Sequence, residues 1–227
     1  MISACIVGKN NEPYIRNCLE SIKDIVDEIV YLDTGSTDKT KEIVQEYTNK
    51  ILEVENHEYN WGDWRTLLIN NATQEWILSI DTDEIATDQL RKQVRSYLKA
   101  LPEQVDHIRF KRFDLIYDLN HYLSSPEEHP YMSHPWLYKR KGAQWVNKVH
   151  EIYVGTGEGA NWDIVGVVHY NLLLIERLRM KTHPQYWDKK KYSDEFILQL
   201  WQRNSVIKEM PLNVTWKEKI KYGTDFN

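Results

Sequence analysis

Two aspartates, Asp81 and Asp83, directly follow the apolar run 76–80 of this 227-residue chain, and Glu84 comes next. Ionised carboxylates are costly to hold at the edge of a core unless positive charge pairs with them. A spacing of two places Asp81 and Asp83 on one side of an extended strand, or near one point where the strand turns. Mg²⁺ prefers one or two carboxylates together with substrate phosphates, so a divalent cation would satisfy both side chains. A solvated acidic turn before the next helix would explain the same residues, and the pattern alone leaves both interpretations open.

The elements that must position these aspartates alternate between strand and helix in the first 100 residues. Short apolar runs predict buried strands, and apolar residues three and four positions apart predict helix faces. We predict strands at 3–7, 28–32, 51–54 and 76–80, and helices at 14–25, from the turn 34–38 to about 47, and at 64–72. This order predicts an α/β fold with a parallel, doubly wound sheet and right-handed crossovers.

The second half of the chain follows a different pattern. An amphipathic helix is predicted at 88–101, and alternating stretches rich in β-branched residues predict antiparallel or mixed additions to the sheet. These stretches are 106–117, 135–139, 144–154 and 164–170. The segment 124–130 is predicted to be a mobile, solvent-facing loop. Because there is no repeat or clear linker, we expect one domain with a helical C-terminal extension over 171–227.

Composition narrows the functional class. The chain has 29 basic and 34 acidic residues, a net charge of −5, which argues against a general binder of nucleic acid or anionic membranes. No apolar run has the length of a membrane span, and the first residues lead directly into a strand, so we expect a cytoplasmic protein. Cys5 and Cys18 lie in apolar patterns and are expected to be buried thiols. Nine tryptophans and fourteen tyrosines add weight to a carbohydrate or nucleotide partner, because aromatic rings stack on sugars and bases.

Three polar segments are expected to meet at one edge of the sheet, because ligands of open parallel sheets bind beyond the carboxyl ends of the strands. They are the loop 9–12, Asp33 with the turn that follows it, and the segment 81–83. The chain has no glycine-rich phosphate-binding loop of the Walker or dinucleotide type, since the turn 33–36 has only one glycine. A diphosphate bound here would therefore need a metal ion rather than backbone amides to offset its charge.

In residues 1–90 the chain resembles a family-2 glycosyltransferase of the GT-A fold. The matching segments are Cys5-Ile6-Val7 with Lys9-Asn10, Cys18-Leu19-Glu20-Ser21-Ile22, Asp27-Glu28-Ile29-Val30, Asp33-Thr34-Gly35-Ser36-Thr37-Asp38, and Trp76-Ile77-Leu78 leading to Asp81-Thr82-Asp83-Glu84. Their combination and order are specific, and weaker matches follow at 149–151 and 168–170. The resemblance implies a Rossmann-like, mostly parallel sheet flanked by helices. It also implies a catalytic domain over 1–170, in which residues 1–100 bind the nucleotide-sugar and residues 101–170 face the acceptor.

The resemblance implies nucleotide contacts at the ends of the first two strands. Asp33 is expected to accept hydrogen bonds from the base or the ribose. Asn10 and Glu12 lie in the loop that lines the base pocket in the family. This loop departs from the family pattern, which has Asn-Glu-Glu where the chain has Asn10-Asn11-Glu12.

Arg65 occupies the place of the arginine that begins an Arg-Asn pair on the family's third helix, and Thr66 replaces the asparagine. The resemblance implies that Arg65 reaches the base or the diphosphate. The alternative is a surface pair with Asp63, since charged side chains are mostly exposed.

The resemblance makes Asp81, Thr82 and Asp83 the DxD element that holds Mn²⁺ or Mg²⁺ against the two phosphates of a nucleotide-sugar. Asp83 is the implied direct ligand, and Asp81 is implied to contact the ribose or a water on the metal. Thr82 belongs to the same nucleotide-sugar site. His169 resembles the late histidine that completes the coordination in many members of the family. Without the resemblance, a hydrogen-bonded core histidine would be the simpler interpretation.

Glu151 is the expected general base of an inverting transfer, which needs a carboxylate or a histidine on the acceptor side. Strand alternation places His150 and Glu151 on opposite faces, so only one of them would point into the site. Asn147 stands where the family usually has glycine, and we therefore expect the loop before Glu151 to be placed differently in this chain.

The leading hypothesis is a metal-dependent glycosyltransferase of the hexosyltransferase type. Its donor would be a UDP-, GDP- or dTDP-sugar, and its acceptor a hydroxyl of a glycan, a protein or a small molecule. The departures at Asn11, Thr66 and Asn147 keep open a non-catalytic module that binds nucleotide-sugars or carbohydrates. A phosphotransferase or phosphatase built on strand-end aspartates is disfavoured, because Ile85 stands where such enzymes commonly have Thr or Val.

Overall fold

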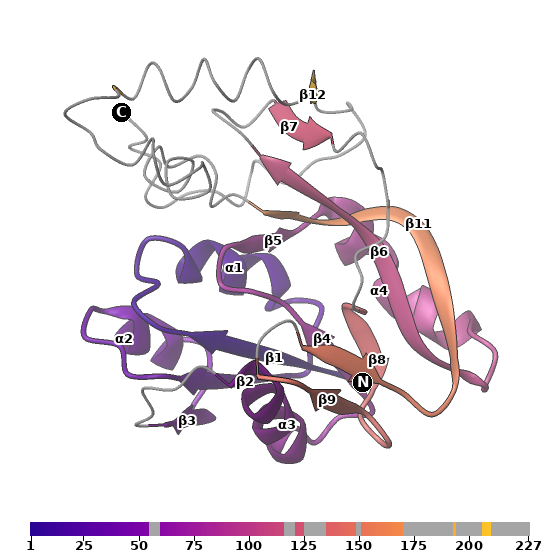
Figure 1. The fold of residues 1–227 in the computed structure, drawn as a ribbon, viewed down its shortest axis with the longest axis horizontal. Helices are drawn as coiled ribbons and strands as arrows, with labels where there is room; N and C mark the ends of the chain where they lie inside the picture. The colour runs from indigo at the N-terminus through magenta and orange to yellow at the C-terminus, as the bar shows by residue number, and fades with distance from the viewer. Residues whose placement is uncertain are drawn as a thin grey trace.

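Four parallel strands form one side of the sheet, in the spatial order β3-β2-β1-β4, with β3 at the edge (Figure 1). The structure is a computed structural model that describes residues 1–54, 60–115, 121–124, 135–148, 151–169, 193 and 206–209. Strands and helices alternate along the first half of the chain, which confirms the predicted order. The elements are β1 (Ile2–Gly8), α1 (Ile15–Ile22), β2 (Glu28–Asp33), α2 (Thr40–Gln45), β3 (Ile51–Glu53), α3 (Trp61–Asn71) and β4 (Trp76–Ser79).

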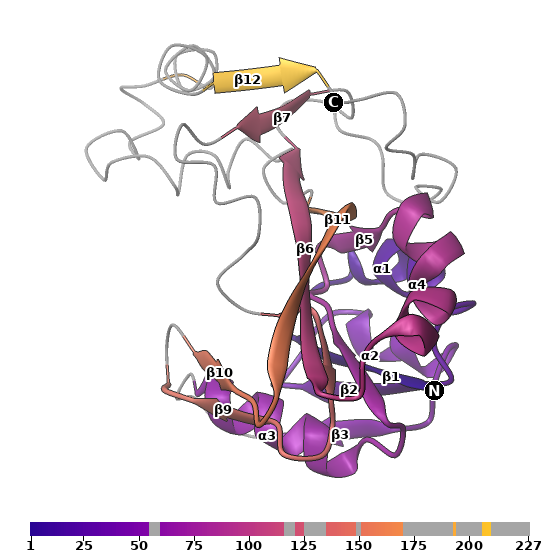
Figure 2. The ribbon, with the colours of Figure 1, turned by 90° about the vertical axis from the view of Figure 1, so that its right-hand side faces the viewer.

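The second half adds strands of mixed direction to this sheet, as predicted. β8 pairs antiparallel with both β4 and β6, and β11 pairs parallel with β6. Figure 2 shows β6 and β11 side by side, with β7 and β12 beyond the end of β6. The elements are β5 (Glu84–Ala86), α4 (Asp88–Ala100), β6 (Val105–Leu115), β7 (His121–Ser124), β8 (Leu137–Lys139), β9 (Gln144–Val146), β10 (Ile152–Val154), β11 (Glu158–His169) and β12 (Val206–Glu209).

Helices cover both faces of these parallel strands (Figure 1). One hydrophobic cluster joins α1, α2 and α4 to the first face, and a second joins α3 and the β9–β10 hairpin to the other. α1 illustrates why these segments are helical, since its apolar residues follow a helical spacing and are all fully buried. None of the described helices is long and apolar enough to cross a membrane. Cys5 and Cys18 are buried free thiols, as expected.

The short strand β5 positions the last residue of β11. It pairs antiparallel with the end of β11, so that His169 lies opposite Glu84. On its other side His169 pairs with Asp114 of β6. β5 was not predicted, because a three-residue strand directly after acidic residues has too little apolar pattern to be recognised. It nevertheless brings the acidic segment 81–84 next to His169.

The structure corrects the sequence prediction in two places. The predicted strand 144–154 is a hairpin, in which β9 and β10 pair antiparallel across a connection at 147–151. In the predicted helical extension, residues 206–209 form β12, which pairs with β7. The helical prediction is wrong for these four residues, because their backbone pairs with a strand distant in sequence. Apart from Ser193, the rest of 171–227 lies outside the described residues, as do 125–130 of the predicted loop.

Candidate functional site

A cavity of about 600 Å³ opens beyond the carboxyl ends of β1 and β4. This is the edge at which the sequence predicts a ligand site. Five of the predicted site residues line the cavity together: Asn10, Asp81, Thr82, Asp83 and His169. The other lining residues are Val7, Gly8, Lys9, Asn11, Thr34, Trp61 and Trp64.

His169 connects two carboxylates at one end of this cavity. Its Nε2 lies 3.2 Å from Asp83 Oδ2, and its Nδ1 lies 2.6 Å from Asp114 Oδ1. Burial alone would lower the pKa of His169, but the hydrogen bonds to Asp114 and Asp83 outweigh it and raise the pKa to about 9. Both aspartates therefore favour the protonated form of the His169 ring.

The turn that carries Asp81 is fixed from below by Glu84. The fully buried Glu84 accepts a hydrogen bond of 3.0 Å from the backbone N–H of Asp81 through Oε2. Its Oε1 lies 3.4 Å from Arg112 Nη1. Burial raises the pKa of Glu84 above its usual range, the charge of Asp81 adds to this, and Arg112 and His169 counteract it. Glu84 thus has a structural role at the strand end.

Of the three predicted metal ligands, Asp83 and His169 are in direct contact. No group of three His, Cys, Asp or Glu side chains suited to a metal ion occurs among the described residues. Asp83 Oδ2 and His169 Nε2, however, are 3.2 Å apart. Two neighbouring ligands of an octahedral Mg²⁺ lie about 3 Å apart when each metal–ligand bond is about 2.1 Å. The separation of this pair is therefore compatible with two ligands of one divalent cation.

Arg65 is buried and contacts three other parts of the site. Its Nε donates to Glu151 Oε1 at 2.9 Å, and its Nη1 donates to Ser79 Oγ at 2.5 Å. Nη2 lies 3.7 Å from Asp81 Oδ1, and the guanidinium carbon lies 4.8 Å from the centre of the Trp145 ring. Burial opposes the charge of Arg65, but Asp81 and Glu151 raise its pKa above the usual value. The side chain is not among those that line the cavity.

The alternative prediction, a surface ion pair between Arg65 and Asp63, is therefore wrong. The side chain of Asn60 instead contacts Asp63 and caps α3 by accepting a hydrogen bond from the backbone N–H of Asp63. Arg65 lies on the buried face of α3, three residues before Leu68 and four before Ile69. This spacing was the available signal that Arg65 points into the protein.

Glu151, the predicted base, directly precedes β10 and is joined to α3 through Arg65. The connection before it is held to the start of α3 by the hydrogen bond from Gly62 N to Asn147 O at 3.2 Å. Asn147 has a φ of 77°, in the left-handed region that favours glycine. The asparagine therefore keeps the backbone conformation for which glycine is suited, and the substitution gives no reason for a displaced loop. His150 lies outside the described residues.

The three residues predicted to contact the base or the ribose are all hydrogen-bonded to the segment 34–39 in this structure. Asn10 Oδ1 and Glu12 Oε2 accept hydrogen bonds of 2.8 and 3.2 Å from backbone N–H groups of the segment 34–39. Asp33 is buried and accepts two from the same segment through Oδ2, at 3.0 and 3.3 Å. Only Asn10 of the three lines the cavity. A contact of these residues with a nucleotide stays a prediction.

Sequence reasoning missed Arg112 and Asp114 on β6 and the two tryptophans of α3. Arg112 and Asp114 have a spacing of two, which places opposite charges on one face of a strand and was a signal for an ion pair. Trp61 and Trp64 line the cavity with ring centres 5.3 Å apart, and their spacing of three on a helix makes them neighbours.

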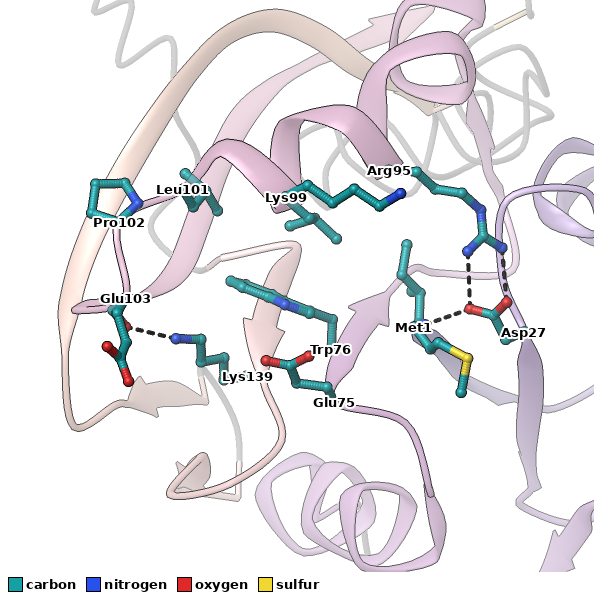
Figure 3. A pocket seen from close by; sticks show the side chains of 12 residues that line it. Met1, Asp27, Glu75, Trp76, Arg95, Lys99, Leu101, Pro102, Glu103 and Lys139 are labelled. Atoms are coloured by element: carbon teal, nitrogen blue, oxygen red, sulfur yellow. Dashed lines mark hydrogen bonds and ion pairs between the residues drawn. The ribbon is translucent and has the colours of Figure 1, made fainter.

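A second cavity, of about 510 Å³, lies near the N-terminal ends of β1 and β4 and contains none of the predicted site residues (Figure 3). Trp76 and Leu101 contribute apolar surface to it. Asp27 is hydrogen-bonded to Arg95 at its rim, and Lys139 Nζ donates to the backbone carbonyl of Glu103. This cavity is lined by both acidic and basic side chains, which do not define one class of ligand.

Comparison with known proteins identifies the family of this chain. The sequence model of the family described as Glycosyl transferase family 2 matches residues 3–160. The lipopolysaccharide core biosynthesis glycosyltransferase LpsC of Rhizobium meliloti is 28% identical over 190 residues, which are 80% of this chain and 67% of that protein. The glycosyltransferase SunS of Bacillus subtilis is 26% identical over 152 residues, 66% of this chain and 34% of that protein. A TPR repeat-containing protein of Synechococcus elongatus is 36% identical over 101 residues, but the chain spans only 24% of its length.

Among solved structures, S. aureus TarS 1–349 is similar with a TM-score of 0.55 and 16% sequence identity. The similarity covers 79% of this chain and 63% of that chain. TarS has also been crystallised with UDP-GlcNAc. At this identity the similarity shows the fold alone, and it confirms the GT-A fold that the sequence predicted.

Proposed function

Because the chain belongs to glycosyl transferase family 2, whose sequence model matches residues 3–160, we propose that it moves a sugar from a nucleoside-diphosphate sugar to a hydroxyl acceptor. The proposed donor is a UDP- or GDP-sugar, and the acceptor is a hydroxyl of a glycan, a protein or a small molecule. The chain spans between 24% and 67% of the lengths of the three curated relatives described above, so the activity is proposed for the domain in hand. The residues proposed to bind the donor are Asn10, Glu12, Asp33, Arg65, Asp81, Thr82 and Asp83.

One observation carries the proposal beyond the family. The guanidinium of Arg65 contacts the candidate base Glu151 at 2.9 Å and Asp81 of the DxD element at 3.7 Å. A transfer enzyme needs its base and its donor site on either side of the reacting carbon, because general base catalysis requires contact with the acceptor hydroxyl. Arg65 keeps the carboxylates of Glu151 and Asp81 within the span of one side chain.

Glu151 takes the proton of the acceptor hydroxyl in the proposed mechanism. The acceptor oxygen forms a bond to the anomeric carbon as the bond from that carbon to the diphosphate oxygen breaks, and the nucleoside diphosphate leaves with the electron pair. Attack opposite the leaving group inverts the anomeric configuration. A double displacement would need a carboxylate nucleophile beneath the sugar. The described residues offer no candidate for it apart from the carboxylates already assigned.

A divalent cation, Mn²⁺ or Mg²⁺, would supply positive charge beside the two phosphates, where negative charge develops as the bond breaks. Asp83 and His169 are proposed to hold it, with Asp81 beside them. The 3.2 Å separation of Asp83 Oδ2 and His169 Nε2 supports this assignment.

A non-catalytic binding module is the alternative, and Asn11 and Thr66 remain its support. Asn147 no longer supports it, because its φ of 77° keeps the conformation for which glycine is suited. The two functions differ in turnover, since a binding module would hold the nucleotide-sugar without releasing the nucleoside diphosphate.

The donor half of the proposal is tested by incubating the purified protein with UDP-, GDP- and dTDP-sugars and Mn²⁺. We expect binding of one donor and slow metal-dependent release of its nucleotide to water. Asp83→Asn should abolish both, while Asp163→Asn on the exposed part of β11 should change neither. No binding and no release with any donor would contradict the proposed function.

The role of Glu151 is tested with Glu151→Gln, which removes the proton acceptor. Because general base catalysis contributes about 10²–10⁴-fold, kcat should fall by this factor while donor affinity is retained. The matched control is Glu158→Gln, at the exposed start of β11. Turnover at an unchanged rate in Glu151→Gln would assign the base elsewhere.

A further inference from the structure

Asp114 is the penultimate residue of β6 and lies directly across from His169, the last residue of β11. Asp114 is not among the residues that line the 600 Å³ cavity beyond the ends of β1 and β4. It nevertheless makes the shortest contact of the His169 ring, at 2.6 Å from Nδ1. We propose that Asp114 is a positioning residue, which fixes the His169 ring with Nε2 towards Asp83 so that both can hold one divalent cation. This inference rests on the proposed function and concerns the same site.

The two nitrogens of the His169 imidazole are not equivalent. A metal ligand must be a neutral histidine, and the hydrogen bond at one nitrogen determines which nitrogen carries the lone pair. An ionised Asp114 can only accept a hydrogen bond, so its contact with Nδ1 selects the proton on that nitrogen of His169. The Nε2 lone pair is then left on the side of Asp83, at 3.2 Å from its Oδ2. A histidine without such a partner could rotate or take the other tautomer.

Asp114 is itself held in place by Arg112. Arg112 Nε lies 3.2 Å from Asp114 Oδ1, the same oxygen that contacts His169. Arg112 Nη1 reaches Glu84 Oε1 at 3.4 Å, and Glu84 Oε2 accepts from the backbone of Asp81 at 3.0 Å. These contacts link the backbone of the DxD turn to the His169 ring through side chains that do not line the cavity. The position of His169 and that of the turn are therefore set by one connected group.

The alternative is an ion pair that only stabilises the joint between β6 and β11. The chain provides a matched control, because Lys111 and Asp163 form a second ion pair between the same two strands, at 2.5 Å. Asp163 is 77% exposed and is not a cavity residue. A purely structural role would make Asp114→Asn and Asp163→Asn differ in stability but not in affinity for a cation.

The test is a titration of the unmodified protein and its variants with Mn²⁺ in the presence of UDP, followed by electron paramagnetic resonance. Loss of a partner of a metal-bound histidine typically costs 10–100-fold in metal affinity. We expect this loss in Asp114→Asn, partial recovery in Asp114→Glu, and unchanged affinity in Asp163→Asn. Unchanged affinity in Asp114→Asn would overturn the inference and leave the proposed function intact. No Mn²⁺ binding by the unmodified protein would overturn both.

A second measurement does not depend on the folding of a variant at position 114. The imidazole ¹⁵N signals of the unmodified protein with Mg²⁺ and UDP report which ring nitrogen carries the proton, and the signal missing in His169→Gln identifies His169. We expect a proton on Nδ1 and none on Nε2. A proton on Nε2 in the cation-loaded protein would overturn the inference.

Discussion

The guanidinium of Arg65 holds the carboxylate of Glu151, which lies 86 residues later in the chain, at 2.9 Å. Both side chains are largely buried, with 8% and 15% of their surfaces exposed. The contact fixes the start of β10 against α3, and it adds to the close approach of the two elements at Gly62. A Cβ atom at Gly62 would lie 2.7 Å from the backbone oxygen of Asn147, so only glycine allows this packing.

We expect Arg65→Met to destabilise the protein by about 3 kcal/mol or more, because removing one partner of a buried ion pair leaves the other charge unpaired. In a double-mutant cycle with Glu151→Gln, the two losses should be non-additive by about 1–3 kcal/mol. Urea unfolding of the four proteins measures this. The exposed pair Arg16–Glu46 is the control, and its coupling should be much smaller. Additive losses in the Arg65–Glu151 cycle would mean that the contact contributes nothing to stability.

The positions of β1, β2 and β4 could be predicted because buried parallel strands are continuous apolar runs, and each of these runs ends in a polar residue at the same sheet edge. Asp81, Asp83 and His169 could be brought together only through the family resemblance. The role of Arg65 could not be predicted from the local pattern, since its partners Glu151, Ser79 and Asp81 come from other elements.

The parts that sequence reasoning missed depend on pairing between distant segments. β12 is recognisable as a strand only through its partner β7, because four residues carry too short a pattern to separate a strand from a helix. The contact between Asp114 and His169 likewise exists because β6 and β11 run parallel in register at their ends. No spacing within either strand encodes that register.

Gly8 at the end of β1 is expected to tolerate no side chain. A Cβ atom there would clash with the hydroxyl of Tyr31 and approach Thr82 Cγ2 to 2.9 Å. Gly8→Ala should therefore cost about 1–3 kcal/mol and weaken donor binding, because overpacking displaces the residues of the cavity. Urea unfolding and titration with the donor measure the two effects.

The hydroxyl of Tyr31 gives a way to relieve this clash. It is buried and has no hydrogen-bond partner among the described residues. Tyr31→Phe should leave stability unchanged or raise it, because it removes an unsatisfied buried polar group. The double variant with Gly8→Ala should recover part of the lost stability. A loss of about 1 kcal/mol or more in Tyr31→Phe alone would show that the hydroxyl is hydrogen-bonded after all.

Asn147 is expected to be replaceable by glycine but not by alanine. Its φ of 77° costs a residue with a Cβ atom about 1–2 kcal/mol, and asparagine and glycine tolerate this conformation best. Asn147→Ala should lower the free energy of unfolding by about 1 kcal/mol, whereas Asn147→Gly should change it by about 0.5 kcal/mol or less. The side chain is exposed, so lost packing contributes little. Equal losses in the two variants would refute the conformational explanation.

Asp106 on β6 makes the stability of the fold depend on pH. Its Oδ2 accepts a hydrogen bond of 2.7 Å from Thr156 N and another from Gly157 N, and its Oδ1 lies 2.5 Å from His107 Nδ1. Burial would raise the pKa of Asp106, but the His107 contact and the two backbone N–H groups outweigh it and lower the pKa below its usual range.

A carboxyl whose pKa is lower in the folded than in the unfolded protein stabilises the fold above its unfolded pKa of about 3.9, and this stabilisation is lost as the pH falls through the folded pKa. We therefore expect Asp106→Asn to be less stable than the unmodified protein at pH 7, and the difference to shrink as the pH is lowered from about 5 towards 2. Urea unfolding at a series of pH values measures it. The carboxyl of Asp163 is mostly exposed. The free energy of unfolding of Asp163→Asn should therefore change with pH in nearly the same way as that of the unmodified protein. A difference for Asp106→Asn that is equally large at pH 7 and pH 3 would mean that hydrogen bonding of the ionised carboxylate is not its cause.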